Sequence, residues 1–240
     1  MATTLTTHQR AVRSTVTKKV IMAVTGLLLV GFLLMHMYGN LKMFMGADSF
    51  NHYAHWLKGA TEDGGIMYPI MPAGVFIWVF RAVLLLALGL HIWAAATLSA
   101  RTIANRGPKY QSNHRLAQTY SARTMRWGGV ILAGFLVFHI LQFTAQVVRT
   151  GFGANAEPYD MVVVSFQNIF VLLAYAIWMV AVCMHVRHGF WSAFTTLGAN
   201  MSANSRKILN GLAVFVAVLL YAGFMIMPVA VFFKLIGGAQ

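Results

Sequence analysis

Acidic residues are scarce in this chain. Of its 240 residues only five are aspartate or glutamate, whereas 18 are lysine or arginine, and the formal net charge is +13. The acids fall in two polar segments, outside every long apolar stretch: Asp48, Glu62, Asp63, Glu157 and Asp160. A carboxylate relay inside a membrane therefore cannot be built from this chain's own residues.

Cysteine is rarer still. Cys183 is the only one, which excludes an internal disulfide, a Cys-x-x-Cys zinc site and an iron–sulfur cluster ligated by this chain alone. The sequence also has no glycine-rich nucleotide-binding loop. Chemistry that depends on any of these groups would have to come from another chain.

Apolar residues dominate what is present. They make up 59% of the chain, in stretches longer than the roughly 20 residues that cross a bilayer core. Only helices and closed barrels satisfy the backbone in lipid, and the alternating pattern of barrel strands is missing. We therefore expect an all-α integral membrane protein: a cytoplasmic N-terminal segment, 1–19, and one domain, 20–235, with five transmembrane helices at 20–44, 70–98, 127–148, 161–185 and 208–233.

Basic residues are distributed unevenly around these stretches. Thirteen lie before the first stretch, between the second and third, or between the fourth and fifth, and four lie in the remaining connections and at the C-terminal end. The positive-inside rule then predicts a cytoplasmic N-terminus and a C-terminus outside. Charges spread over loops in this way do not form the single basic face of a nucleic-acid-binding module.

Four histidines lie in four different apolar stretches. Because the spans alternate in direction, position along a helix converts to depth at 1.5 Å per residue. His36 and His139 then share an outer level, and His91 and His185 share an inner level. Facing helices of membrane bundles hold cofactor metals in this way. A haem iron with two imidazole ligands has no open position, which suits electron transfer, so the pattern predicts two bis-histidine haems.

Each of these histidines also has a plainer interpretation, as a hydrogen-bonded packing residue. The pairing in depth favours ligation. Gly189, four residues after His185, would let a porphyrin approach the backbone. Glycines five and ten residues before His36 and His139 fit either that purpose or close helix packing.

Other polar residues in or near the spans are weaker candidates. Arg81 is the one cation well inside a span, and we expect it to pair with a haem propionate; the alternative is an arginine that snorkels to the interface. His188 competes with His185 for the inner ligand position but lies nearer to water, which favours a propionate contact. His52 and His55, three residues apart in an outer segment, form at most a weak metal site.

Several segments, taken in order, carry a family resemblance. In combination they make the chain closely similar to the cytochrome b membrane-anchor subunits of succinate dehydrogenases and fumarate reductases of the single-anchor, five-helix, di-haem type. The match extends from Ser14 into the fifth span. The segments are STVTKKVIMAVTGLLL, FNHYAHWL, WVFRAVLLLALGLHIWAA, RTMRWGGV, FQNIF and MHVRHGFWSAFTTLG.

The resemblance implies that His36, His91, His139 and His185 are axial ligands of two haem b groups. It also implies a subunit of succinate:quinone oxidoreductase, respiratory complex II, in a prokaryotic plasma membrane. In that family a flavoprotein and an iron–sulfur subunit dock on the cytoplasmic side and carry out the dicarboxylate chemistry of the tricarboxylic acid cycle. The anchor transfers electrons and binds quinone, for which menaquinone is the expected species. A homotrimer of complexes remains open.

The resemblance marks further residues near the two membrane faces. Ser14, Lys18 and Lys19 match a family segment beside the docking surface and are candidate donors to a quinone carbonyl or a haem propionate. Asp63, which precedes two glycines, lies where relatives carry a quinone-site acid. The alternative for Asp63 is a solvated loop charge.

Two other functions stay open. The same architecture serves quinol:fumarate reductases, although the lack of a glutamate within the bundle favours succinate oxidation. A haem-free membrane scaffold or small transporter is the alternative of a different class, and it predicts inverted repeats or broken helices. The sequence has no evident inverted repeat, and Pro228 is expected only to bend or end the fifth span.

Overall fold

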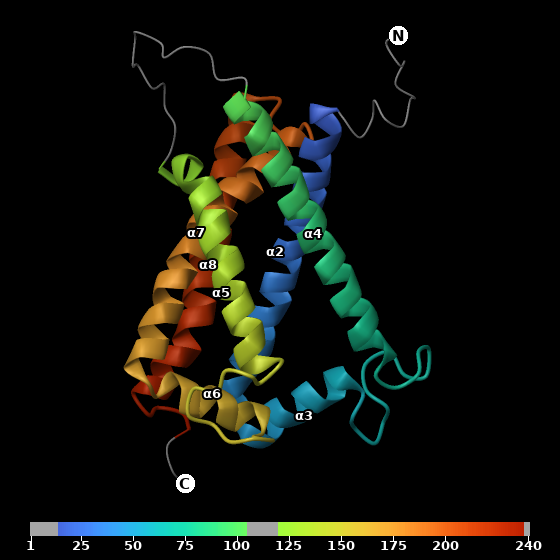
Figure 1. Cartoon of the computed structure of the whole chain (residues 1–240), viewed down its shortest axis with the longest axis vertical. Helices are drawn as coiled ribbons and strands as arrows, with labels where there is room; N and C mark the ends of the chain where they lie inside the picture. The colour runs from blue at the N-terminus through green and yellow to red at the C-terminus, as the bar shows by residue number, and fades with distance from the viewer. Residues whose placement is uncertain (1–13, 105–119, 238–240) are drawn as a thin grey trace.

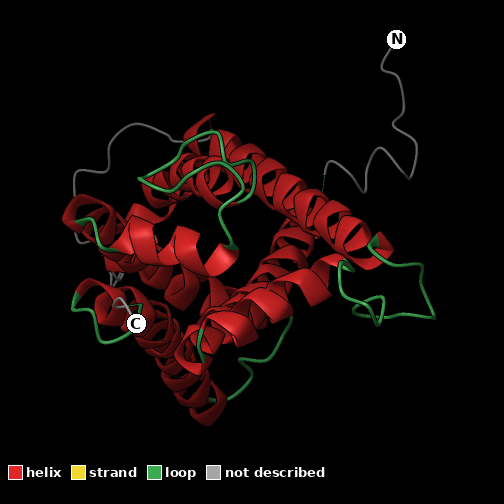
Figure 2. Cartoon of the chain, turned by 90° about the horizontal axis from the view of Figure 1, so that it is seen from below, coloured by secondary structure: helices red, strands yellow, loops and turns green. Residues whose placement is uncertain are grey.

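The computed structural model describes residues 14–104 and 120–237. These residues form helices joined by loops, with no strand among them (Figure 2). Five helices are long and apolar enough to cross a membrane, which confirms the predicted all-α class and the number of candidate spans. They are α2 (Thr15–Leu41), α4 (Val75–Ala104), α5 (Tyr120–Phe143), α7 (Ile169–Thr196) and α8 (Ala203–Phe232).

The long helices run between the same two ends of the molecule, with α4 inclined to the others, and two shorter helices lie across one of these ends (Figure 1). We call this end the capped end, because α3 (Ala47–Lys58) and α6 (Pro158–Phe166) cover it. All five acids belong to its helices and loops. We call the other end, where α2 begins, the basic end, because the long helices carry most of their lysines and arginines there.

The helices pack around a contact between α2 and α7 in the middle of the bundle. Helix α4 packs on α2, α5 packs on α7, and α8 packs on both α7 and α2. Toward the capped end α4 diverges from α5 (Figure 1). Small residues allow the close approach of α4 to α2, since Ala87 and Ala94 are its buried residues. Large apolar side chains of α4 such as Leu85 and Leu86 are exposed, as expected of a lipid-facing surface.

The helix boundaries differ from the predicted ones at several ends, and two of these differences affect where site residues lie. The fourth apolar stretch is divided, because α6 ends at Phe166 and Asn168 caps the start of α7: its side chain accepts a hydrogen bond of 2.9 Å from the backbone N–H of Phe170. Helix α7 then continues to Thr196, so His185 lies well inside the helix. At the N-terminal end, Ser14 caps a first helix that begins before residue 20. Residues 1–13 of the predicted N-terminal segment lie outside the described part.

Two contacts join the helices of the capped end. The side-chain oxygen of Asn51 accepts a 2.9 Å hydrogen bond from the backbone N–H of Tyr159. The imidazole Nε2 of His55 lies 2.9 Å from a carboxylate oxygen of Glu157. His55 is therefore engaged with an acid, while His52 is exposed, and the described residues supply no group of three side chains that could hold a metal ion.

The loop between α3 and α4 folds back on the end of α3 through a glycine. Gly65 has a φ of +78°, and a Cβ atom at this position would overlap the carbonyl oxygen of Trp56. Gly74, at the end of the same loop, has nearly the same φ of +79°, but its Cβ would lie 3.3 Å from the nearest atom, the carbonyl oxygen of Lys58. The two glycines thus share a backbone conformation but differ in the room available for a side chain.

We expect Gly65→Ala to lower the melting temperature of the protein in detergent more than Gly74→Ala does. Both substitutions place a side chain in a left-handed conformation, which costs about 1–2 kcal/mol, but only the first also pushes two backbone segments apart. Thermal unfolding followed by circular dichroism measures the difference. A greater loss for Gly74→Ala would contradict this account of the loop.

Candidate metal centre: two histidine pairs

The four predicted histidines meet in two pairs inside the bundle. The ring centres of His36 on α2 and His139 on α5 are 5.9 Å apart, with an angle of 83° between the ring planes. Those of His91 on α4 and His185 on α7 are 6.2 Å apart, at 61°. Each pair therefore joins two helices, and together the pairs draw one histidine from each of α2, α4, α5 and α7.

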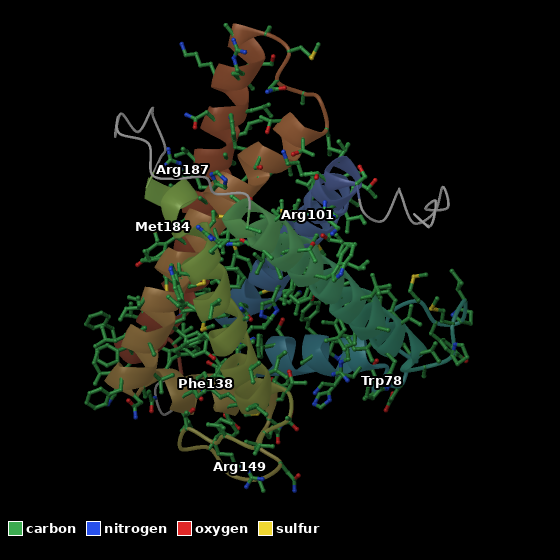
Figure 3. The ribbon with its side chains drawn as sticks, turned by 45° about the horizontal axis from the view of Figure 1, so that its top comes forward. Trp78, Arg101, Phe138, Arg149, Met184 and Arg187 are labelled. Carbon is green, nitrogen blue, oxygen red and sulfur yellow. The ribbon has the colours of Figure 1, made fainter. Side chains whose placement is uncertain are left out.

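The pairs lie at two levels. Tyr175 on α7 contacts His139, and His185 follows ten residues later on the same helix, which corresponds to about 15 Å along the axis. Figure 3 labels Phe138 and Met184, the sequence neighbours of these histidines, and shows them at different heights in the bundle. The pair of His36 and His139 is nearer the capped end, and the pair of His91 and His185 is nearer the basic end.

The separation within each pair suits two ligands of one metal ion. Bonds from a metal to an imidazole nitrogen are about 2 Å long, so two imidazoles on opposite sides of one ion have ring centres roughly 6 Å apart. Two side chains alone do not complete a coordination sphere, and no group of three or more metal-binding side chains occurs among the described residues. A haem iron needs only two protein ligands, because the porphyrin supplies the others.

The Nδ1 atom of His91 is held by α2. It lies 3.2 Å from the carbonyl oxygen of Met22 and 3.3 Å from the hydroxyl of Thr25. A carbonyl can only accept, so Nδ1 carries the proton and Nε2 keeps its lone pair for a metal. Gly26, one turn after Met22 on α2, gives the ring room, since a Cβ at this position would lie 3.2 Å from the Cε1 atom of His91.

The Nδ1 atom of His139 is held by a buried hydrogen-bond network. It lies 3.1 Å from the phenol oxygen of Tyr175, whose O–H donates to the side-chain carbonyl of Gln142 at 2.7 Å. Gln142 is completely buried, and its amide donates to the hydroxyls of Thr150 at 2.8 Å and Ser165 at 3.2 Å. Because the phenol O–H of Tyr175 donates its hydrogen bond to Gln142, the phenol oxygen is free to accept a hydrogen bond from the Nδ1–H of His139.

Tyr175 and Gln142 are site residues that the sequence analysis missed. The available signal was Gln142, an uncharged polar residue three positions after His139 and thus on the same helical face. Tyr175 lies in the middle of an apolar stretch and gives no such signal in sequence, because its role depends on how α7 packs against α5.

The ring nitrogens of the other two histidines, His36 and His185, make no hydrogen bond among the described residues. The Nδ1 atom of His185 is buried without a hydrogen-bond partner, and the ring of His36 stacks on Phe32 with centres 5.3 Å apart. Among the described residues, no hydrogen bond reaches the Nε2 atom of any of the four histidines. Ring pairs with uncommitted Nε2 atoms fit a haem iron by donor chemistry and by spacing.

The remaining candidates lie away from the ring pairs or have other contacts. Arg81 stacks on Trp78, with 4.8 Å from its guanidinium carbon to the ring centre, in the half of α4 that leads from the capped end (Figure 3). His188 is half-buried on α7, one turn beyond His185. Lys18 is buried on α2 beside Trp93, while its neighbour Lys19 is exposed.

Asp63 lies exposed in the loop between α3 and α4. Its carboxylate accepts hydrogen bonds from the hydroxyl of Thr61 and, at 3.1 Å, from the backbone N–H of Gly65. These two bonds lower the pKa of the Asp63 carboxyl below its ordinary value. The carboxylate is therefore ionised at neutral pH and stabilises the local turn.

Fold and spans define a multi-pass helical membrane protein. Comparisons of the chain with protein-family models, with curated proteins and with solved structures found no match. The likeness to cytochrome b anchor subunits therefore stands on the quoted segments alone.

We expect Tyr175→Phe to destabilise the protein. The change removes the hydroxyl that joins His139 to Gln142 and leaves buried polar atoms without partners, which costs about 1–3 kcal/mol. Thermal unfolding in detergent measures the loss. Tyr221→Phe is the matched control on α8, because Tyr221 is exposed, and we expect a change within about 0.5 kcal/mol. Equal effects of the two substitutions would mean that the network does not stabilise the bundle.

Proposed function

We propose that this chain is the di-haem cytochrome b anchor subunit of a succinate:quinone oxidoreductase, which carries electrons between an iron–sulfur subunit and a membrane quinone. The observation that carries the proposal is the presence of two imidazole pairs at two levels of one bundle, with ring centres 5.9 and 6.2 Å apart. One pair alone would suit a single cofactor. Two pairs at different levels of the bundle suit electron transfer from one membrane face to the other.

The histidines have distinct roles in this proposal. His36 and His139 would hold one haem b, and His91 and His185 the other. A haem with two imidazole ligands supplies one-electron transfer at the iron without an open position for oxygen. Met22 and Thr25 orient His91, and Tyr175 orients His139, so one ligand of each pair is fixed in the tautomer that leaves Nε2 available.

The direction of the bundle in the membrane follows from charge. With the basic end in the cytoplasm, the arrangement obeys the positive-inside rule, and the N-terminus lies inside and the C-terminus outside. The iron–sulfur and flavoprotein subunits would dock on this end, where the chain offers cations but no acids. Electrons from those partners would then enter at His91 and His185, the nearer pair.

Quinone chemistry would take place in the membrane, with menaquinone as the expected species. The family resemblance assigns Asp63 to this chemistry. In support, its carboxylate is ionised and exposed at the capped end, where a proton could be exchanged with water. No acid lies within the long helices, so proton exchange during quinone turnover would use groups of the capped end.

The alternatives are weaker. Fumarate reduction by quinol would use the same histidine pairs. The only observation against this function is that the long helices contain no glutamate. A small transporter is expected to contain helices broken near the membrane midplane. The break between α6 and α7 lies at the capped end instead, and α8 continues through Pro228.

The proposal predicts two b-type haems per chain in the purified protein. We expect His91→Ala or His185→Ala to remove one haem, and His36→Ala or His139→Ala to remove the other. A pyridine haemochrome assay counts the haem, and reduced-minus-oxidised optical spectra identify its type. Reduction by succinate in membranes that contain the partner subunits then gives the direction of electron flow.

His188→Ala is the matched control, because His188 lies on the same helix as His185 and pairs with no other imidazole in the described part of the chain. We expect it to retain both haems. A wild-type protein that binds no haem would refute the electron-transfer function. Loss of haem in His188→Ala, with retention in His185→Ala, would refute the assignment of the ligand pair.

A further inference from the structure

A buried lysine lies at the basic end of the bundle. Lys18 is on α2, one turn after the capping residue Ser14, and only 6% of its surface is exposed. Its ammonium group lies 5.1 Å from the centre of the Trp93 ring on α4. A lysine whose side chain packs against its own helices near the end of a membrane-crossing helix favours an anionic partner for its ammonium group.

A second cation lies beside it. The guanidinium of Arg101, near the end of α4, donates a 3.3 Å hydrogen bond to the hydroxyl of Thr15. Thr15 is three residues before Lys18 and hence on the same face of α2. Figure 3 shows Arg101 where α4 approaches the start of α2. Two cations, a hydroxyl and the N-terminus of α2 therefore converge between these two helices, and all of them favour a negative charge.

The chain cannot supply that negative charge. Its five acids all belong to the helices and loops of the capped end, at the other end of the long helices. The sequence of segments 1–13 and 105–119, which lie outside the described part, contains no aspartate or glutamate. The anion must come from another molecule.

The lysine and the nearest paired histidine contact α4 and α2 at neighbouring positions. Trp93 follows His91 by two positions, which turns the helix by about 200°, so the two side chains leave α4 in opposite directions. Lys18 lies over the Trp93 ring. Lys18 also lies one turn before Met22, whose carbonyl oxygen contacts His91, so a propionate of the proposed haem is the competing anion, and the lipid-binding test distinguishes the two.

The surroundings identify the kind of ligand. Val16 and Ile103, which flank Thr15 and Arg101 in sequence, are large apolar residues with exposed side chains, and Trp93 is partly exposed as well. Basic groups near helix ends, bordered by exposed apolar side chains and a tryptophan, match the interface between lipid headgroups and acyl chains. We propose that Lys18, Arg101 and Thr15 bind the phosphate of one anionic phospholipid, whose acyl chains lie along the exposed apolar surface of α2 and α4.

The test uses the full-length protein, purified in detergent and stripped of lipid. Phosphatidylglycerol or phosphatidylcholine is added, and native mass spectrometry counts the lipid retained at each concentration. We expect one phosphatidylglycerol to bind in preference to phosphatidylcholine. Lys18→Gln and Arg101→Gln should each weaken this binding about fivefold, the effect of losing one cation at a membrane surface.

Lys19→Gln is the matched control, because Lys19 is the adjacent residue and is exposed. We expect it to keep the wild-type affinity, and Lys18→Arg to keep binding because the charge is retained. If Lys18→Gln does not fold, lipid binding by Arg101→Gln, which should be weaker, and by Lys18→Arg, which should be retained, tests the proposal instead. The proposal is overturned by equal binding of the two lipids, by an equal loss in Lys19→Gln, or by displacement of phosphatidylglycerol with inorganic phosphate.

Discussion

A neutral imidazole inside a membrane bundle has two ring nitrogens that must be satisfied without water, and this requirement shapes the centre of the molecule. An unpaired polar atom there costs about 1–3 kcal/mol. The chain satisfies Nδ1 of His91 with a backbone carbonyl and Nδ1 of His139 with a phenol. The Nε2 atoms have no partner among the described residues. A metal ion between the two rings of each pair would supply one.

The two supported histidines belong to different pairs and are supported by different means. The orientation of His91 depends on a hydrogen bond to the backbone carbonyl of Met22 on α2, which a side-chain substitution cannot remove. His139 depends on the side chains of Tyr175 and Gln142, and through them on the hydroxyls of Thr150 and Ser165. The pair near the capped end is therefore coupled to the loop before α6, whereas the pair near the basic end is coupled only to the packing of α2 on α4. Two cofactors held in this way would differ in their surroundings even with identical ligands.

The parts of this structure that follow from local physics were predictable. Helix length and apolar content indicate five spans, and the constant rise of a helix turns sequence position into depth, so the histidines could be matched before their rings were seen to meet. The break at Asn168 has a local cause as well, an N-cap, but within an apolar stretch it is hard to distinguish from continued helix. The placement of α3 and α6 across one end, and the contact of Tyr175 with His139, depend on tertiary packing and have no sequence signal of their own. The burial of Lys18 likewise appears only once α4 covers it.

The central claim is that each histidine pair binds one iron through both imidazoles. Electron paramagnetic resonance of the oxidised protein at low temperature tests this most directly, because the spectrum of a ferric haem reports its axial ligands. The account predicts two low-spin signals of the bis-imidazole type, both with the strong anisotropy expected for ligand planes that are far from parallel, as the angles of 83° and 61° indicate. A high-spin ferric signal, or a single low-spin species in protein with its full haem content, would contradict it.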